Sequence, residues 1–257
     1  MKRLATAIFA LLLFGAIKLP FEKALMSEHR AAHFHSSELN LDLREQIGQG
    51  GFIAALSGFR SILADLVYIR AHIAWENVEW GRMKLFFDAA TSLQPRATMF
   101  WEGASHHMAY NASHAAYDDP KQPREALRIK AQREYFKLGE QYLLRGIQYN
   151  PDRAALFNYL GLLYKDKFKD PCKASWAFAE AAKRPDALPY AKRIAVYQLS
   201  HCPGHEQEAY EKLKTLYHMG PDERLPTLLK RIEYLQDKLN IPPAERIDTT
   251  RDWEELR

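Results

Sequence analysis

One stretch of the sequence, residues 157–185, sets large and small side chains in an order that severely restricts the fold. The succession is Phe157, Leu160, Gly161, Tyr164, Ala174, Phe178, Ala181 and Pro185. Small residues let two antiparallel helices approach closely, large residues fill the space between them, and a proline ends the second helix. The pattern therefore predicts a hairpin of two tightly packed helices.

The same pattern recurs upstream of this hairpin. A first helix over residues 98–111 carries Trp101, and a second helix carries Gly139, Leu143 and Gly146 before it ends at Pro151. Trp101 and Pro151 are 50 residues apart, whereas the corresponding positions of one unit are about 28 residues apart. The difference indicates an insertion near residues 112–130.

Two weaker copies complete the series. The first covers residues 61–95, and the last has Ala209 and Leu213 in its second helix, followed by a capping helix over residues 225–239. The residues that we expect to pack the units together are Trp101, Gly139, Leu143, Gly146, Pro151, Phe157, Leu160, Gly161, Tyr164, Ala174, Phe178, Ala181, Ala209 and Leu213. Arrays of this kind need three or more units to be stable. The sequence thus predicts about four helix hairpins over residues 59–240.

The succession from Phe157 to Pro185 resembles the tetratricopeptide repeat, a helix hairpin of about 34 residues. The resemblance implies an all-α, tetratricopeptide-type α-solenoid. Residues 63–111, which include Trp75 and Trp80, are also similar to bacterial membrane-anchored tetratricopeptide proteins. A generic helical bundle is the alternative interpretation of the fold.

The amino-terminal residues 1–25 have the composition of a membrane anchor or an export signal. Met1-Lys2-Arg3 is basic, and the stretch from Leu4 to Ile17 carries no charge. As a helix this stretch spans about 21 Å, and Leu19 to Phe21 extend it towards the roughly 30 Å of a bilayer core. No good cleavage site follows, so we favour an uncleaved signal-anchor, with a cleaved signal or a buried core helix as alternatives. The basic start predicts that the amino end stays cytoplasmic and that the rest of the chain is exported. Together with the resemblance to bacterial membrane-anchored proteins, this implies a single-pass protein of the bacterial inner membrane, with its solenoid in the periplasm or otherwise outside the cytoplasm.

Two polar segments flank the predicted array. Residues 26–58 form a juxtamembrane linker that is polar at first and then rich in glycine, which is typical of a flexible hinge. Residues 241–257 form a polar tail with a lone Trp253, which we expect to be disordered, with a docking peptide as the alternative. The mean hydropathy of −0.41 excludes a polytopic membrane protein.

No catalytic motif marks the chain as an enzyme. It has no Gly-x-Ser-x-Gly elbow, and no Lys-Ser/Thr follows its glycine-rich stretch as a phosphate loop requires. His106, His107 and His114 lie near acidic residues at the insertion. A metal- or ligand-dependent activity at these histidines is the alternative to a polar loop over the array. We expect no cofactor and no bound metal.

The two cysteines form a candidate pair. Cys172 falls at the start of the second helix of one unit, and Cys202 falls at the end of the first helix of the next. In stacked hairpins these two ends lie at the same edge, so a disulfide is sterically plausible, and export would favour it. Two reduced, half-buried thiols are the alternative.

Charge is unevenly distributed along the chain. Residues 121–169 contain eleven Lys and Arg and five Asp and Glu, a balance of +6, whereas the whole chain has a net charge of +4. The mild overall charge argues against a nucleic-acid partner. The candidate partner-binding residues are Asn158, Lys165, Lys167, Lys130, Arg133 and Lys137. They predict binding of an acidic peptide or helix, with anionic lipid or simple solvent exposure as alternatives.

Together these features favour a non-enzymatic, membrane-anchored scaffold that assembles or stabilises an envelope protein complex. Its amino-terminal helix holds the array at the membrane, and the array positions a partner by shape and charge. A structural subunit that is permanently buried in a large membrane complex is a further alternative.

Overall fold

A computed structural model of the protein describes residue 48 and residues 58–255. Within these residues the chain forms helices and connecting turns and contains no strand, which confirms the all-α prediction for this part of the chain. The predicted anchor, residues 1–25, and nearly all of the linker lie outside the described residues. In the part that was searched, no helix combines the length and the apolar character needed to span a bilayer.

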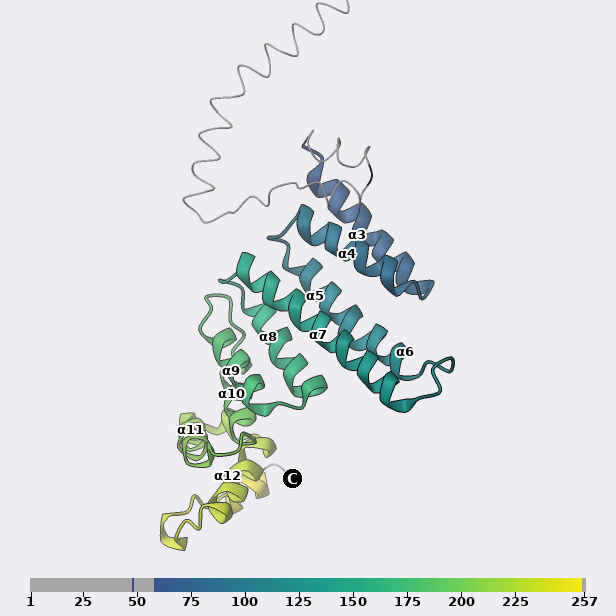
Figure 1. The fold of residues 1–257 in the computed structure, drawn as a ribbon. Coiled ribbons are helices and arrows are strands. Elements are labelled where there is room, and N and C mark those ends of the chain that lie inside the picture. The colour runs from purple at the N-terminus through teal and green to yellow at the C-terminus, as the bar shows by residue number, and fades with distance from the viewer. Residues whose placement is uncertain (1–47, 49–57, 256–257) are drawn as a thin grey trace, which may run out of the picture. The chain divides into compact units, whose positions relative to one another are not determined.

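The first pair of helices is α3 (Arg60–Glu76) and α4 (Trp80–Leu93), joined by a short turn at Val78 (Figure 1). α3 packs closely on α4. The face of α3 that meets α4 carries small residues, of which Ala64 and Ala71 are fully buried. Phe87 of α4 is also fully buried, and the centre of its ring lies 5.7 Å from that of Tyr68 on α3. Small residues on one helix therefore admit the large aromatic side chain of the other.

The second pair has a composite first helix. α5 (Thr98–His106) continues through the π-helical segment η1 (His107–Ala112) into α6 (Ser113–Tyr117). After a short connection, α7 (Glu125–Tyr149) runs back along it. The extra residues predicted as an insertion at 112–130 therefore lengthen both helices of this hairpin.

The third pair is α8 (Ala154–Leu163), with its π-helical extension η2 (Tyr164–Phe168), and α9 (Pro171–Ala182). Lys169 adopts a left-handed conformation with φ 54° between them. The Asp170 carboxylate then accepts a hydrogen bond from the backbone N–H of Lys173 at 2.9 Å. This cap satisfies one of the free N–H groups at the start of α9.

The fourth pair is α10 (Tyr190–Leu199) and α11 (Glu206–Met219). It is followed by the 3₁₀ turn η3 (Pro221–Glu223) and by α12 (Pro226–Lys238), which packs on α11. Each pair also contacts the next one, through α4 with α5, α7 with α8, and α9 with α10.

The predicted packing residues line these contacts. All of them are buried except Pro151, which is exposed in the turn after α7. A β-carbon on Gly146 would lie 2.7 Å from Trp101 Cγ, and one on Gly161 would lie 2.8 Å from Phe178 Cε2. Glycine is needed at both positions because the facing aromatic ring fills the space where a side chain would begin.

The carboxy-terminal tail packs on the last helices, so the prediction of a disordered tail is wrong. Residues 241–255 include the 3₁₀ turn η4 (Pro243–Glu245) and α13 (Thr250–Glu255). Asp252 is 7 % exposed and accepts hydrogen bonds from Tyr217 Oη at 2.6 Å and Arg224 Nη1 at 3.2 Å. Trp253 Nε1 donates to the Glu233 carboxylate at 2.6 Å. The tail is polar because its side chains complete this network with partners on and beside α11 and α12.

Candidate functional site

The six predicted partner-binding residues lie in two parts of the structure, three on α7 and three on α8 and η2. Lys130, Arg133 and Lys137 are exposed on α7, where their spacing places them on one side of the helix. Lys137 pairs with Glu134 at 3.1 Å. These three residues form a basic side of α7.

The other three predicted residues lie on α8 and η2 and are engaged within the protein. Asn158 is only 7 % exposed, and its Oδ1 atom is buried without a hydrogen-bond partner among the described residues. Lys165 pairs with Asp166 at 3.3 Å. The Lys167 ammonium lies 4.2 Å from the centre of the Tyr110 ring, and burial lowers its pKa. Lys167 therefore belongs to a packed joint between the second and third pairs of helices.

The two π-helical segments meet at this joint. Tyr110 in η1 donates a hydrogen bond to Asp166 in η2 at 3.4 Å, and its ring stacks on His106 with 5.0 Å between ring centres. Burial, together with the Asp166 carboxylate, raises the pKa of Tyr110 to about 12. π-Helical turns often mark functional positions, and here side chains of the two turns contact each other.

The three histidines of the alternative hypothesis do not converge. His114 is exposed and lies 3.2 Å from Asp118, whereas His107 is only 7 % exposed among aromatic rings. The His106 ring stacks on Tyr110, and its centre lies 5.9 Å from the centre of the His107 ring in an edge-to-face contact. Within the described ranges, no group of three or more metal-ligating side chains is placed to hold a metal ion.

His107 is part of a chain of hydrogen bonds whose donors can be assigned. Asn111 Nδ2 lies 2.9 Å from His107 Nδ1, His107 Nε2 lies 3.4 Å from His72 Nε2, and His72 Nδ1 lies 3.0 Å from the Tyr68 carbonyl oxygen. The amide nitrogen at one end only donates and the carbonyl at the other end only accepts. Both imidazoles are therefore neutral in this arrangement. Burial, followed by the nearby His72 imidazole, lowers the pKa of His107 to about 4.

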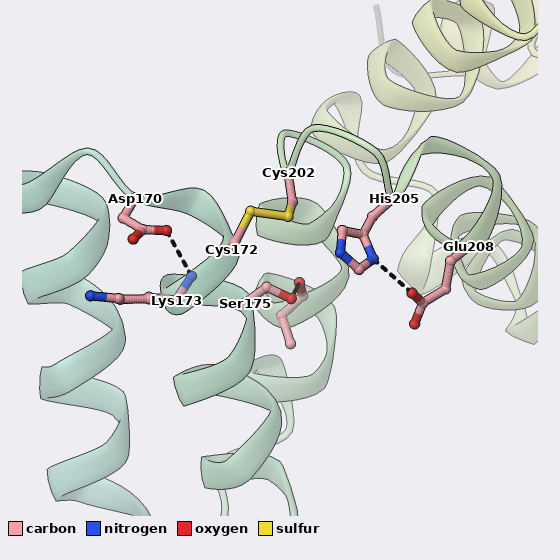
Figure 2. The surroundings of a disulfide bond; sticks show 8 residues. Asp170, Cys172, Lys173, Ser175, Cys202, His205 and Glu208 are labelled. Atoms are coloured by element: carbon pink, nitrogen blue, oxygen red, sulfur yellow. Dashed lines mark hydrogen bonds and ion pairs between the residues drawn. A yellow bond between two sulfur atoms is a disulfide. The ribbon is translucent and has the colours of Figure 1, made fainter.

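The two cysteines are joined in a disulfide, with a Cα–Cα distance of 4.9 Å (Figure 2). Cys172 lies in the first turn of α9, and Cys202 lies just after α10 and is 3 % exposed. One helical turn further along α9, Ser175 donates a hydrogen bond from Oγ to the Ala195 carbonyl oxygen at 2.9 Å. α9 and α10 are thus connected by a covalent bond and a buried hydrogen bond at the same end.

Beside this connection, α9, α10 and α11 enclose a cleft of about 350 Å³. Ala195, Val196 and Leu199 of α10 form its largely buried floor. Ser175, Ala179 and Ala182, at helical spacing along α9, form one wall, and Thr215 and Leu216 of α11 belong to the other. The small side chains on α9 leave an apolar space that α11, which packs less closely on α10 than α9 does, leaves unfilled.

Three lysines stand at the rim of this cleft: Lys183, Lys192 and Lys212. Lys183 pairs with Glu180 at 2.5 Å and Lys212 pairs with Glu208 at 2.7 Å. Hydrogen bonds from these lysines lower the pKa of both glutamates. Lys192 is exposed and makes no ion pair within the part of the chain that the structure describes. The cleft thus combines an apolar interior with one uncompensated positive charge at its rim.

Sequence reasoning missed this cleft. Its lysines belong to the end of α9, to α10 and to α11, and they lie outside the basic stretch of residues 121–169. The signal in the sequence was the run of small residues Ser175, Ala179 and Ala182, which has no large partner assigned to it.

The sequence matches no protein-family model, and neither a curated protein nor a solved structure matches it. In the part of the chain that the structure describes, the protein belongs to the all-helical class.

Proposed function

We propose that the protein is a non-enzymatic, membrane-anchored scaffold that binds a segment of a partner protein and so helps to assemble an envelope complex. In this proposal residues 1–25 are a single inner-membrane span, and the helix pairs form a tetratricopeptide-type solenoid in the periplasm. The order of the packing residues from Phe157 to Pro185 supports the repeat assignment. The disulfide between Cys172 and Cys202 supports an oxidising location, because structural disulfides are rare in the cytosol.

The observation that carries the proposal is the cleft between α9, α10 and α11. A partner segment with one apolar side chain beside a carboxylate matches it, since the apolar group fills the space and the carboxylate meets Lys192. Burying a side chain the size of leucine contributes about 1.5–3 kcal/mol, and a hydrogen bond between charged groups contributes about 1.5–3 kcal/mol. Together these favour an acidic amphipathic peptide or helix as the ligand.

Charge elsewhere favours the same class of partner. Lys183 and Lys212 are themselves exposed and pair with Glu180 and Glu208, and such surface pairs hold their partners weakly, so a partner carboxylate can compete for these lysines. Lys130, Arg133 and Lys137 on α7 are exposed and add positive potential that speeds the approach of an acidic protein.

A photo-crosslinking experiment tests the proposal. A photoreactive phenylalanine analogue at Thr215, an exposed residue of the cleft wall, is expected to crosslink a defined protein in intact membranes. Ala179→Leu fills the cleft and Lys192→Glu reverses its free charge. Each change is expected to reduce that adduct at least tenfold, since a tenfold change needs only about 1.4 kcal/mol.

Two matched controls keep the result specific. The photoreactive residue at Gln207, exposed on α11 but away from the cleft, is expected to give no such adduct. Lys230→Glu makes the same charge change at an exposed position on α12 and is expected to leave the adduct unchanged. An adduct that survives both cleft variants would rule the cleft out as the partner site.

A further inference from the structure

The outer face of α3 carries a continuous row of large apolar side chains. Phe59, Ile62, Leu66, Ile69 and Ile73 are 58 %, 57 %, 53 %, 55 % and 50 % exposed. They are spaced by three and four residues in alternation, so they lie within about 80° of one another around the helix. We name this row the α3 seam.

The opposite face of α3 already has its partner. Ala64, Val67, Ala71 and Ala74 are buried there against α4. α3 therefore has a face of small residues turned towards the protein and a face of large aliphatic residues turned away from it. A helix that is apolar on both faces is normally buried on both, which indicates that a further element covers the seam.

The spacing of the seam is that of a coiled coil. Phe59, Leu66 and Ile73 take the a positions of a heptad, and Ile62 and Ile69 take the d positions. Asp65 then lies at a g position and Arg70 at the e position of the following heptad. Both are exposed, and neither side chain has an ion-pair partner among the described residues.

These two charges select the orientation of a second α3. In a parallel pair of helices, the g residue of one helix meets the e residue five positions later on the other. Asp65 of each copy would therefore meet Arg70 of the other, forming two symmetric ion pairs. In an antiparallel pair, g residues face g residues and e residues face e residues, so Asp65 could not meet Arg70.

We infer that the α3 seam is a self-association surface, on which a second copy of this chain packs its own α3 in parallel and in register. The arrangement is a two-fold interface in which each copy presents the same patch. It is independent of the cleft between α9, α10 and α11. A membrane surface suits the seam less well, since helices that lie on membranes are flanked mainly by Lys and Arg, and this seam is flanked by Asp65 and Glu76 as well as Arg70.

The seam is short, which sets the expected strength of the dimer. It covers little more than two heptads, whereas independent coiled coils usually need at least three or four. We therefore expect dissociation in the micromolar range for the detergent-solubilised protein. Confinement of both copies to one membrane raises their effective concentration and favours the dimer there.

Cysteine crosslinking of the full-length protein tests this inference. The native cysteines are joined in the disulfide, so a single added cysteine is the only free thiol. Ile62→Cys and Ile69→Cys are each expected to give covalent dimers under mild oxidation, because in a parallel pair every seam residue faces its own copy. Ser61→Cys, exposed on the same helix but outside the seam, is the matched control and is expected to remain monomeric.

Each other outcome contradicts the inference. Crosslinking at only one of the two seam positions indicates an antiparallel pair, since a single position can lie on the two-fold axis. No crosslinking at either position means that something else covers the seam, such as lipid or another segment of this chain. A covalent product at Ser61→Cys equal to that at Ile62→Cys would indicate random collisions.

A charge exchange provides the second measurement. Asp65→Lys places like charges at both ion pairs and is expected to weaken the dimer at least tenfold in analytical ultracentrifugation. The double variant Asp65→Lys/Arg70→Glu restores opposite charges and is expected to recover dimerisation. Circular dichroism checks that the exposed substitutions leave the helices intact. If the double variant fails to recover the dimer while remaining folded, the parallel arrangement is wrong.

Discussion

Gly146 shows how one residue sets the distance between two helices. Because alanine is favoured over glycine in a helix by about 1 kcal/mol, Gly146→Ala would stabilise α7 if space were available. The added β-carbon would instead lie 2.7 Å from Trp101 Cγ and 2.9 Å from Trp101 Cβ. Trp101 is 1 % exposed and its Nε1 donates to the Pro95 carbonyl oxygen, so the indole has no room to move. We expect Gly146→Ala to lower the free energy of unfolding by about 1–3 kcal/mol.

Urea denaturation measures this change, and Gly81→Ala in α4 is its matched control. A β-carbon on Gly81 would meet nothing within 4 Å. The control is therefore expected to leave the free energy of unfolding unchanged or slightly higher. Equal stability of Gly146→Ala and the native protein would mean that the two helices separate easily.

His107 makes stability depend on pH. Its pKa in the folded protein is about 4, whereas a histidine in an unfolded chain has a pKa near 6.5. Between these values the unfolded chain binds a proton that the folded chain does not. The stabilisation that comes from burying neutral His107 is therefore fully present above pH 6.5. We expect the free energy of unfolding to fall by about 2 kcal/mol between pH 7 and pH 5.

Comparison with His107→Gln isolates this contribution. Burial also lowers the pKa of His106 and of His201. The native protein and the His107→Gln variant are therefore both expected to lose stability as the pH falls. The variant is expected to show a flatter dependence because it lacks the buried imidazole. Parallel curves for the two proteins would show that His107 is protonated as easily when folded as when unfolded.

At the level of single residues, the sequence predicted which side chains are packed together. The order of Phe157, Gly161 and Phe178 identified side chains that are buried together, because close helix packing demands small residues opposite large ones. The same reasoning could not tell that Lys167 lies against the Tyr110 ring. The sequence does not distinguish a lysine that faces solvent from one that packs on an aromatic ring, because residues distant in the chain determine its environment.

At the level of helices, the predicted bounds agree closely with the structure. The expected helix over residues 98–111 corresponds to α5 with η1 (Thr98–Ala112), and the expected helix over residues 225–239 corresponds to α12 (Pro226–Lys238). Such ends can be predicted because proline and glycine residues close to them in the sequence limit the helices. The π-helical turns η1 and η2 were not predicted, since each depends on a shift in backbone hydrogen bonding within an otherwise regular helix.

The disulfide is expected to contribute substantially to the stability of α9 and α10. Cys172 and Cys202 are 30 residues apart, and closing a loop of this length in the unfolded chain corresponds to about 3–4 kcal/mol. Cys172→Ala/Cys202→Ala is therefore expected to lower the free energy of unfolding by about that amount. A reducing agent is expected to destabilise the native protein and to leave the double variant unaffected. Urea denaturation of the native protein and of the double variant, each with and without the reducing agent, measures this. Equal midpoints for all four samples would contradict the prediction.

At the level of the whole chain, the limits of prediction have a common cause. The cleft arises because α11 diverges from α10 beside a row of small residues on α9, and no local sequence pattern encodes that divergence. The tail was misjudged for a similar reason. Asp252 and Trp253 are typical of exposed tail residues until Tyr217, Arg224 and Glu233 are placed around them.

The seam on α3 is different, because its spacing was already present in the sequence. Phe59, Ile62, Leu66, Ile69 and Ile73 follow the heptad rule without any structure. What the structure adds is their exposure, since the same pattern would be expected of a helix buried against its own neighbours. A self-association surface can therefore be distinguished from a core face only after the helix has been packed.

The disulfide also determines how the protein bears mechanical load. If the amino end is held in a membrane and a partner pulls elsewhere, tension reaching Cys172 crosses directly to Cys202, whose Cα atom is 4.9 Å away. The intervening chain, about 100 Å long when extended, carries none of it. That protected loop contains every cleft residue contributed by α9 and α10. The floor and one wall of the cleft would therefore keep their form under a pull that unravels the helices on either side.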